Sequence, residues 1–367
     1  MKKLVKRVVF LDYLRVLACM MVMVVHACEL YYFGEDGGVF VASRGDARWL
    51  TVFDSAVRAS VPLFVMASAY LLFPLTRPTG EFFRRRLMRV GVPFAVWAVV
   101  YTWRYGGSWG QLGFNFPMAT GGHLWFVPML FGLYLLMPLI SPWAEKVSER
   151  ELRGWLGLWL VTTLFPYLRS LWSWLYGEPA FGAVPYLWGE CPWNHFGAFQ
   201  YVGGFIGYLL LGFWFRKFAP VLSWRRTLAW AVPLWVVGML VCALPFYSRI
   251  PAVNGYPASA PYATAVFMEM SWEFCSTGVL MTVIAYFLVI RKFTFDGAFY
   301  VRLIRPLSEA SYETYLMHML ILVVVGGWLK PRLATPLAIL AIALVTFFVA
   351  SVVSLALRRI PRLGRYL

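Results

Sequence analysis

Residues 10–29 read FLDYLRVLACMMVMVVHACE, a run in which most side chains are apolar. A helix rises about 1.5 Å per residue, so a run of about 20 residues can cross the hydrocarbon core of a bilayer, which is about 30 Å thick. Similar apolar runs recur along the whole 367-residue chain. The sequence therefore predicts an all-α polytopic membrane protein.

The composition excludes the main alternatives to a membrane protein. Apolar residues make up 61% of the chain and charged residues only 14%, whereas charged residues are about 25% of an ordinary soluble domain. A disordered chain would contain far fewer apolar residues. The five cysteines are an odd number and form no Cys-x-x-Cys motif, so they predict neither a disulfide framework nor a zinc site.

The apolar runs predict about ten transmembrane helices in one domain that covers residues 1–367, with no separate soluble domain. The expected spans are 8–30, 50–74, 90–105, 122–141, 154–174, 200–218, 227–247, 262–290, 308–329 and 334–357. Most of the basic residues behind the net charge of +16 lie in short clusters between these runs. By the positive-inside rule, ten spans place those clusters and both termini in the cytoplasm. Topology thus explains the charge better than nucleic-acid binding does.

One face of the first predicted helix carries a stripe of six residues, four of them ionisable, because they are spaced alternately three and four apart. The stripe consists of Asp12, Arg15, Cys19, Val22, His26 and Glu29. Ionisable groups are costly at membrane depth, so the stripe should face the bundle interior or a water-filled cavity. Arg15 and His26 are three turns, or about 16 Å, apart. One cavity would then bind an anion near the cytoplasm and transfer a proton farther in.

Structural roles are open alternatives for the stripe. An arginine near a helix end often extends its charge to the membrane surface. A histidine within the membrane can simply link two helices. Asp12 lies three residues before Arg15 and can pair with it.

The first span also resembles a known family. Asp12-Tyr-Leu-Arg15, followed by ten residues and His26, resembles the Arg-x10-His signature of the acyltransferase family 3 membrane proteins. Arg86-Leu-Met-Arg89 resembles the basic Arg-x-x-Arg motif with which the third span of that family begins on the cytoplasmic side.

Two further segments match the family in the same order. Gly122-His123-Leu-Trp125-Phe-Val resembles its His-Leu-Trp-Phe segment, which opens the fourth span. Ser311-Tyr-Glu-Thr-Tyr315-Leu-Met-His318 resembles its late Ser-x-x-x-Tyr-Leu-x-His segment. Together with the ten-span layout, the four motifs extend the resemblance over nearly the whole chain.

The resemblance implies a multi-pass O-acyltransferase of the bacterial cytoplasmic, or inner, membrane. Members of the family take an acyl group, usually acetyl, from a cytoplasmic acyl-CoA and pass it to a hydroxyl of a glycan or another acceptor. Acetyl-CoA is the expected donor, with succinyl or longer groups as alternatives. No metal and no nucleic acid are implied.

The same resemblance, combined with side-chain chemistry, assigns roles. His26 is the expected general base and Glu29 the carboxylate that orients it. Arg15, Arg86 and Arg89 are expected to bind the CoA phosphates, because a guanidinium forms bidentate contacts with phosphate oxygens. The cavity is expected to be lined by Asp12, His123, Trp125, Tyr315 and His318.

Other roles are open for several of these residues. Arg86 and Arg89 can equally belong to a topological basic cluster, and Trp125 to the interfacial aromatic belt. Tyr315 and His318 can link helices instead of acting in catalysis.

Three further ionisable residues lie in predicted spans without an assigned role. Glu269 and Glu273 in the eighth span and Arg58 in the second can form a buried pair or line the acceptor path. His195 lies in a predicted outer loop and is expected at the surface.

Three rival functions remain. A proton-coupled transporter or flippase of an envelope saccharide would also need ionisable groups in several spans. It would usually show repeated halves, which the sequence lacks. A different class of membrane acyltransferase would also use an intramembrane histidine. A non-catalytic glycan-binding protein would not require His26.

Overall fold

The computed structural model of the protein describes residues 7–32, 41, 43–106, 108, 110, 122–176, 193–254 and 269–360. All regular structure within these ranges is helical, which confirms the predicted all-α class. The α-helices are α1 (Val9–Glu29), α2 (Arg44–Val57), α3 (Ser60–Leu72), α4 (Thr79–Arg86), α5 (Val92–Arg104), α7 (Phe126–Lys146), α8 (Glu149–Thr162), α9 (Phe165–Tyr176), α10 (Ile206–Lys217), α11 (Trp224–Asn254), α13 (Thr277–Ile290), α14 (Arg305–Leu329) and α15 (Thr335–Arg358). Four short helices join them: the π-helices η1 (Leu87–Gly91) and η4 (Tyr300–Ile304), and the 3-10 helices η2 (Gly122–Trp125) and η3 (Glu269–Trp272).

Among the described residues, six helical segments are long and apolar enough to cross a membrane. They are Val9–Glu29, Arg44–Leu72, Gly122–Lys146, Trp224–Ser248, Tyr300–Leu329 and Thr335–Arg358. Each overlaps one of the predicted spans. The other four predicted spans hold shorter helices, namely α5, α8 with α9, α10, and α13. The count of about ten therefore stays a prediction.

Prolines divide two of the predicted spans. The span predicted at 50–74 is α2 followed by α3, with a turn at Arg58 and Ala59. Pro62 has no backbone N–H, and its ring collides with the carbonyl four residues earlier, which is that of Arg58. Pro166 ends α8 before α9 in the same way. The first of these breaks places Arg58 at a bend in the middle of the bundle.

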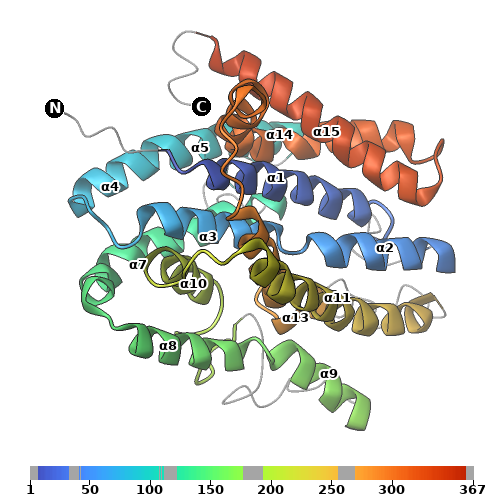
Figure 1. Ribbon diagram of the computed structural model, residues 1–367. Coiled ribbons are helices and arrows are strands. Elements are labelled where there is room, and N and C mark those ends of the chain that lie inside the picture. The colour runs from blue at the N-terminus through green and yellow to red at the C-terminus, as the bar shows by residue number, and fades with distance from the viewer. Residues whose placement is uncertain are drawn as a thin grey trace.

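Helix α1 is the central element of the bundle. It packs against α3 on one side and against α14 and α15 on the other (Figure 1). Most of its side chains are buried, whereas Arg15, His26 and Glu29 of the stripe are partly exposed. Because other helices pack around α1, it can present ionisable groups without exposing them to lipid.

The outward faces of α11 and α15 are apolar and exposed, as expected for helices that contact lipid. The first residue of α1 and the last of α15 lie at the same end of the bundle (Figure 1).

Candidate active site

The first part of the site is a histidine–carboxylate pair in the last turn of α1. The Nδ1 atom of His26 lies 2.5 Å from Oε2 of Glu29, and the two side chains are 14% and 21% exposed. An ionised carboxylate can only accept hydrogen bonds, so Nδ1 carries the hydrogen and Nε2 is the basic nitrogen. The structure thus brings the two residues predicted for catalysis into direct contact.

His26 belongs to a three-histidine cluster with His123 of η2 and His318 of α14. The ring centroids of His26 and His318 are 5.0 Å apart, as are those of His123 and His318, and those of His26 and His123 are 6.4 Å apart. His318 is fully buried and His123 is 7% exposed. Three motifs that are far apart in the sequence therefore meet at one point in the fold.

Hydrogen bonds to backbone carbonyls fix the cluster. His123 Nε2 and the Tyr101 hydroxyl both donate to the carbonyl of Leu316, at 3.4 and 3.0 Å. The Tyr315 hydroxyl donates to the carbonyl of His123, and His318 Nδ1 donates to that of Tyr315. Tyr315 thus joins α14 to η2. The Nε2 atom of His318 is buried and has no partner within the described residues.

A cavity of about 130 Å³ opens beside this cluster and is called the histidine cavity here. Its lining consists of Val22, Val25, His26, Glu29, Arg58, Ser60, Val61, His123, Trp125, Phe126, Phe274 and Tyr315. Five of these residues were predicted for the site. Apart from Arg58 and Ser60, the other lining residues are apolar.

Arg58 is the main polar residue of this cavity to which the sequence assigned no role. Its Nε and Nη2 donate to the two carboxylate oxygens of Asp54 at 2.7 and 2.9 Å, and Nη2 also donates to the Tyr32 hydroxyl at 3.1 Å. Its guanidinium lies 4.9 Å from the ring centroid of Trp272. The four-residue spacing of Asp54 and Arg58 in an apolar run was the available signal for a buried ion pair.

A second cavity, of about 240 Å³, is called the arginine cavity here. Its lining consists of Arg15, Phe64, Ser68, Arg86, Val90, Phe126, Leu130, Tyr134, Ser308, Glu309, Ser311, Tyr312 and Tyr315. The side chain of Arg15 is 31% exposed. The Nε atom of Arg86 is buried and has no hydrogen-bond partner within the described residues. Two guanidinium groups therefore border one space, as an anion site needs.

Arg89 is exposed and does not line this cavity. Arg86 ends α4, whereas Arg89 lies inside the π-helix η1. A π-helix has a wider turn than an α-helix, so two residues three positions apart no longer share one face. The structure therefore separates the two arginines of the motif, and a donor-binding role for Arg89 stays a prediction.

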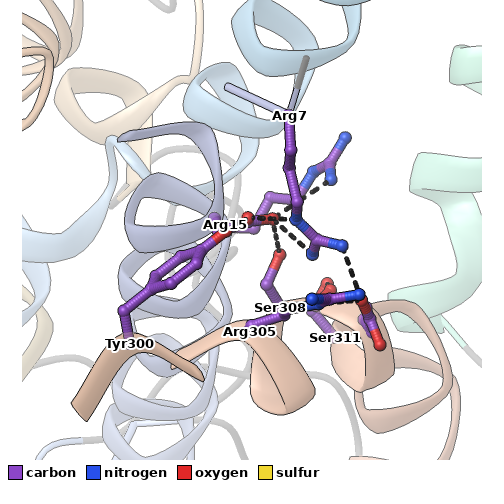
Figure 2. A network of polar contacts seen from close by, with 8 residues as sticks. Arg7, Arg15, Tyr300, Arg305, Ser308 and Ser311 are labelled. Atoms are coloured by element: carbon purple, nitrogen blue, oxygen red, sulfur yellow. Dashed lines mark hydrogen bonds and ion pairs between the residues drawn. The ribbon is translucent and has the colours of Figure 1, made fainter. Parts of the chain in front are cut away.

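Asp12 does not hold Arg15 as closely as the sequence suggested. The nearest atoms of the two side chains are 3.9 Å apart. Asp12 instead accepts hydrogen bonds from Arg7 at 2.6 and 3.0 Å, from Tyr300 at 2.6 Å and from Ser308 at 2.7 Å. Figure 2 shows Arg7, Tyr300 and Ser308 converging from three directions. Asp12 therefore joins α1 to η4 and α14 beside the arginine cavity, without being one of its lining residues.

Arg7 is the cation of this network. It precedes α1 and also donates to Glu309 at 2.5 Å. Its hydrogen bonds to Asp12 and Glu309 raise the pKa of its guanidinium above the ordinary value, so Arg7 stays charged at any working pH. Sequence reasoning missed Arg7 because it counted the residue only as part of a basic cluster.

Two other ionisable residues singled out in the sequence, Glu273 and His195, line neither cavity. Glu273 is partly buried in the turn after η3, next to Phe274 of the histidine cavity. The side chain of Glu269 lies outside the described part of the structure. His195 is exposed, as predicted. Among the described residues, no group of three or more His, Cys, Asp or Glu side chains is arranged to hold a metal ion.

A known family matches nearly the whole sequence. The sequence model of acyltransferase family 3, described as "Acyltransferase domain", matches residues 8–355. Comparison with curated proteins and with solved structures gives no match. Because the family match covers nearly the whole chain, the protein belongs to this family and is an integral membrane acyltransferase.

Proposed function

We propose that this member of acyltransferase family 3 is an O-acyltransferase that transfers an acyl group, most often acetyl, from cytoplasmic acyl-CoA to an envelope glycan or a similar hydroxyl acceptor. The observation that carries the proposal is the His26–Glu29 pair on the wall of a cavity, with two arginines bordering the adjacent cavity. The family match supports acyl transfer in general. The donor, the acceptor and the residue roles are our proposal.

The first step needs a base, because a sugar hydroxyl is a poor nucleophile. His26 Nε2 takes the proton from the acceptor hydroxyl while Glu29 holds Nδ1–H and stabilises the resulting imidazolium. The hydroxyl oxygen bonds to the thioester carbonyl carbon, whose oxygen becomes negative. The carbon–sulfur bond then breaks, and the CoA thiolate takes the proton from His26. One ester and one thiol replace one hydroxyl and one thioester.

The negative oxygen of the intermediate needs a donor that is already in place. Arg58 lines the histidine cavity, and Asp54 and Tyr32 hold its guanidinium in one orientation. We assign to Arg58 the stabilisation of this oxygen. In the arginine cavity, Arg15 and Arg86 bind the CoA phosphates.

The test uses purified protein with radiolabelled acetyl-CoA, alone and with envelope glycan extract. Wild type is compared with His26→Ala and with His195→Ala, a control that changes an exposed histidine. We expect acceptor-dependent release of CoA to fall by about 10²- to 10⁴-fold in His26→Ala, the usual contribution of a general base. The control should retain wild-type activity.

Two outcomes would contradict the proposal. Equal activity in His26→Ala would exclude His26 as the base. If folded wild-type protein neither bound CoA nor turned over acetyl-CoA, acetyl-CoA would be excluded as the donor. That result would favour the transporter hypothesis.

A further inference from the structure

The histidine cavity and the arginine cavity share two lining residues, Phe126 and Tyr315. We call this pair the aromatic barrier. Each side chain is 6% exposed, and their ring centroids are 5.6 Å apart at an interplanar angle of 75°. The two rings come from different elements, the start of α7 and the middle of α14. Rings from two helices thus form part of the wall of both cavities.

Neighbouring side chains hold the barrier in place. The Tyr315 hydroxyl donates to the carbonyl of His123, and its ring centroid lies 5.7 Å from that of His318. The Phe126 ring lies 6.1 Å from the ring of Phe64. These contacts fix the position of each ring between the two cavities.

The proposed reaction must cross this barrier. The phosphates of the donor lie with Arg15 and Arg86 in one cavity, whereas the base His26 lies in the other. Arg15 and His26 are three turns apart on α1, about 16 Å. The thioester end of the donor must therefore pass between Phe126 and Tyr315 for its carbonyl carbon to reach the acceptor oxygen.

We propose that the aromatic barrier determines which acyl groups are transferred, by admitting a short acyl group to the histidine cavity and excluding both longer chains and excess water. This inference rests on the proposed function. The small size of the histidine cavity, about 130 Å³, agrees with a short acyl group beside an acceptor hydroxyl.

The barrier also protects the thioester. If water replaces the acceptor, its oxygen bonds to the carbonyl carbon and the carbon–sulfur bond breaks. The products are then a carboxylic acid and CoA thiol, which takes the second proton of the water. Excluding water until the acceptor is bound suppresses this loss.

The first experiment replaces the aromatic ring of Phe126 with a smaller aliphatic side chain. In Phe126→Leu, we expect the ratio of kcat/KM for butyryl-CoA to that for acetyl-CoA to rise at least about ten-fold, the usual scale for excess methylene groups in an apolar pocket. Hydrolysis of acetyl-CoA without acceptor should also rise relative to transfer. Phe126→Val should show larger changes than Phe126→Leu, because it removes more of the barrier.

The matched control is Phe213→Leu. Phe213 is a buried phenylalanine of α10 that lines neither cavity. It should lose a similar amount of packing and leave the donor preference unchanged. Wild-type donor preference and wild-type hydrolysis in folded Phe126→Leu protein would overturn the inference. If the wild-type protein transferred acetyl in the same assay, the proposed function would still stand although the inference about the barrier had failed.

The second experiment needs no enzymatic activity. Val22 lines the histidine cavity and not the arginine cavity, so Val22→Cys in a cysteine-free background reports access to the histidine cavity. A charged thiol reagent is applied to each membrane face in turn. We expect labelling from one face only, and from both faces when Phe126→Val is added. Labelling from both faces without the second substitution would show that Phe126 and Tyr315 do not block access between the two cavities.

Discussion

Arg58 is a buried cation in the middle of a membrane protein, and its environment explains how the fold tolerates it. Asp54, in the last turn of α2, supplies the opposite charge through two hydrogen bonds to Arg58 at the bend. Buried charges of this kind are costly unless they are paired. The pair therefore has no net charge. The guanidinium can border the histidine cavity without making it a general anion-binding site.

A charge-neutral double substitution separates the structural role of Arg58 from its proposed catalytic role. Arg58→Gln alone leaves Asp54 without its arginine and should destabilise the protein by about 3–5 kcal/mol. Asp54→Asn/Arg58→Gln removes both charges and should recover most of the melting temperature in detergent. We expect the double variant to stay deficient in acyl transfer. Wild-type activity in that variant would show that Arg58 only supports the fold.

At this scale the sequence predicted part of the site. The alternating spacing of the α1 stripe was enough to place His26 and Glu29 on one face, because helical geometry fixes neighbours three and four residues apart. The meeting of His26 with His123 and His318 depends on how η2 and α14 pack against α1. Local periodicity carries no information on that contact.

The π-helix η1 separates the two arginines of the Arg-x-x-Arg motif, of which only Arg86 lines the arginine cavity. Arg86 borders the arginine cavity, and its buried Nε has no hydrogen-bond partner in the described part of the chain, whereas Arg89 is exposed. We therefore expect Arg86→Ala to raise the KM for acetyl-CoA at least about ten-fold, since hydrogen bonds to charged groups contribute about 1.5–3 kcal/mol. Arg89→Ala should change the KM far less. Both values come from CoA release at varied donor concentration.

Equal increases in KM for the two variants would show that Arg89 also reaches the donor. The π-turn would then not distinguish the two arginines in donor binding. Arg84→Ala is a further control, because Arg84 is exposed on α4 next to the same cluster. A wild-type KM in Arg84→Ala would exclude a general effect of local positive charge.

Helix boundaries were predicted less well than helix existence. The span expected at 50–74 is two helices, because apolar periodicity continues through a proline that the backbone cannot accommodate without a bend. The π-turn at η1 also precedes a proline. Pro93 lacks an N–H, and its ring displaces the carbonyl of Arg89 four residues earlier. Helix α7, however, continues through Pro138 and Pro142. Proline positions alone therefore do not predict whether a helix breaks, widens into a π-turn or continues.

On the scale of the whole molecule, basic side chains join the ends of several helices. Arg216 donates to the carbonyls of Tyr70 and Phe73 at the end of α3, and Lys217 donates to three carbonyls at the end of α7. Arg291, which follows α13, donates to the carbonyls of Ala219 and Pro220 after α10. The ends of these four helices therefore lie at one end of the bundle.

This arrangement bears on the number of spans. If only the six longest segments crossed the membrane, a single crossing would separate the end of α3 from the end of α7, and the two ends would lie on opposite faces. The contacts of Arg216 and Lys217 place them at the same end of the bundle. This is the arrangement that the ten-span prediction gives, in which the short helix α5 is a second crossing between them. This supports the alternation expected for ten spans.

Single cysteines at exposed positions test the span number directly. The native cysteines are replaced first, because four are buried and Cys191 lies outside the described residues. With ten spans, Arg84→Cys and Arg153→Cys should be labelled from the same face by an impermeant maleimide, and His195→Cys from the opposite face. With six spans, position 153 would instead share the face of position 195. The first pattern would also place the arginine cavity on the face with the basic clusters, where cytoplasmic acyl-CoA is available.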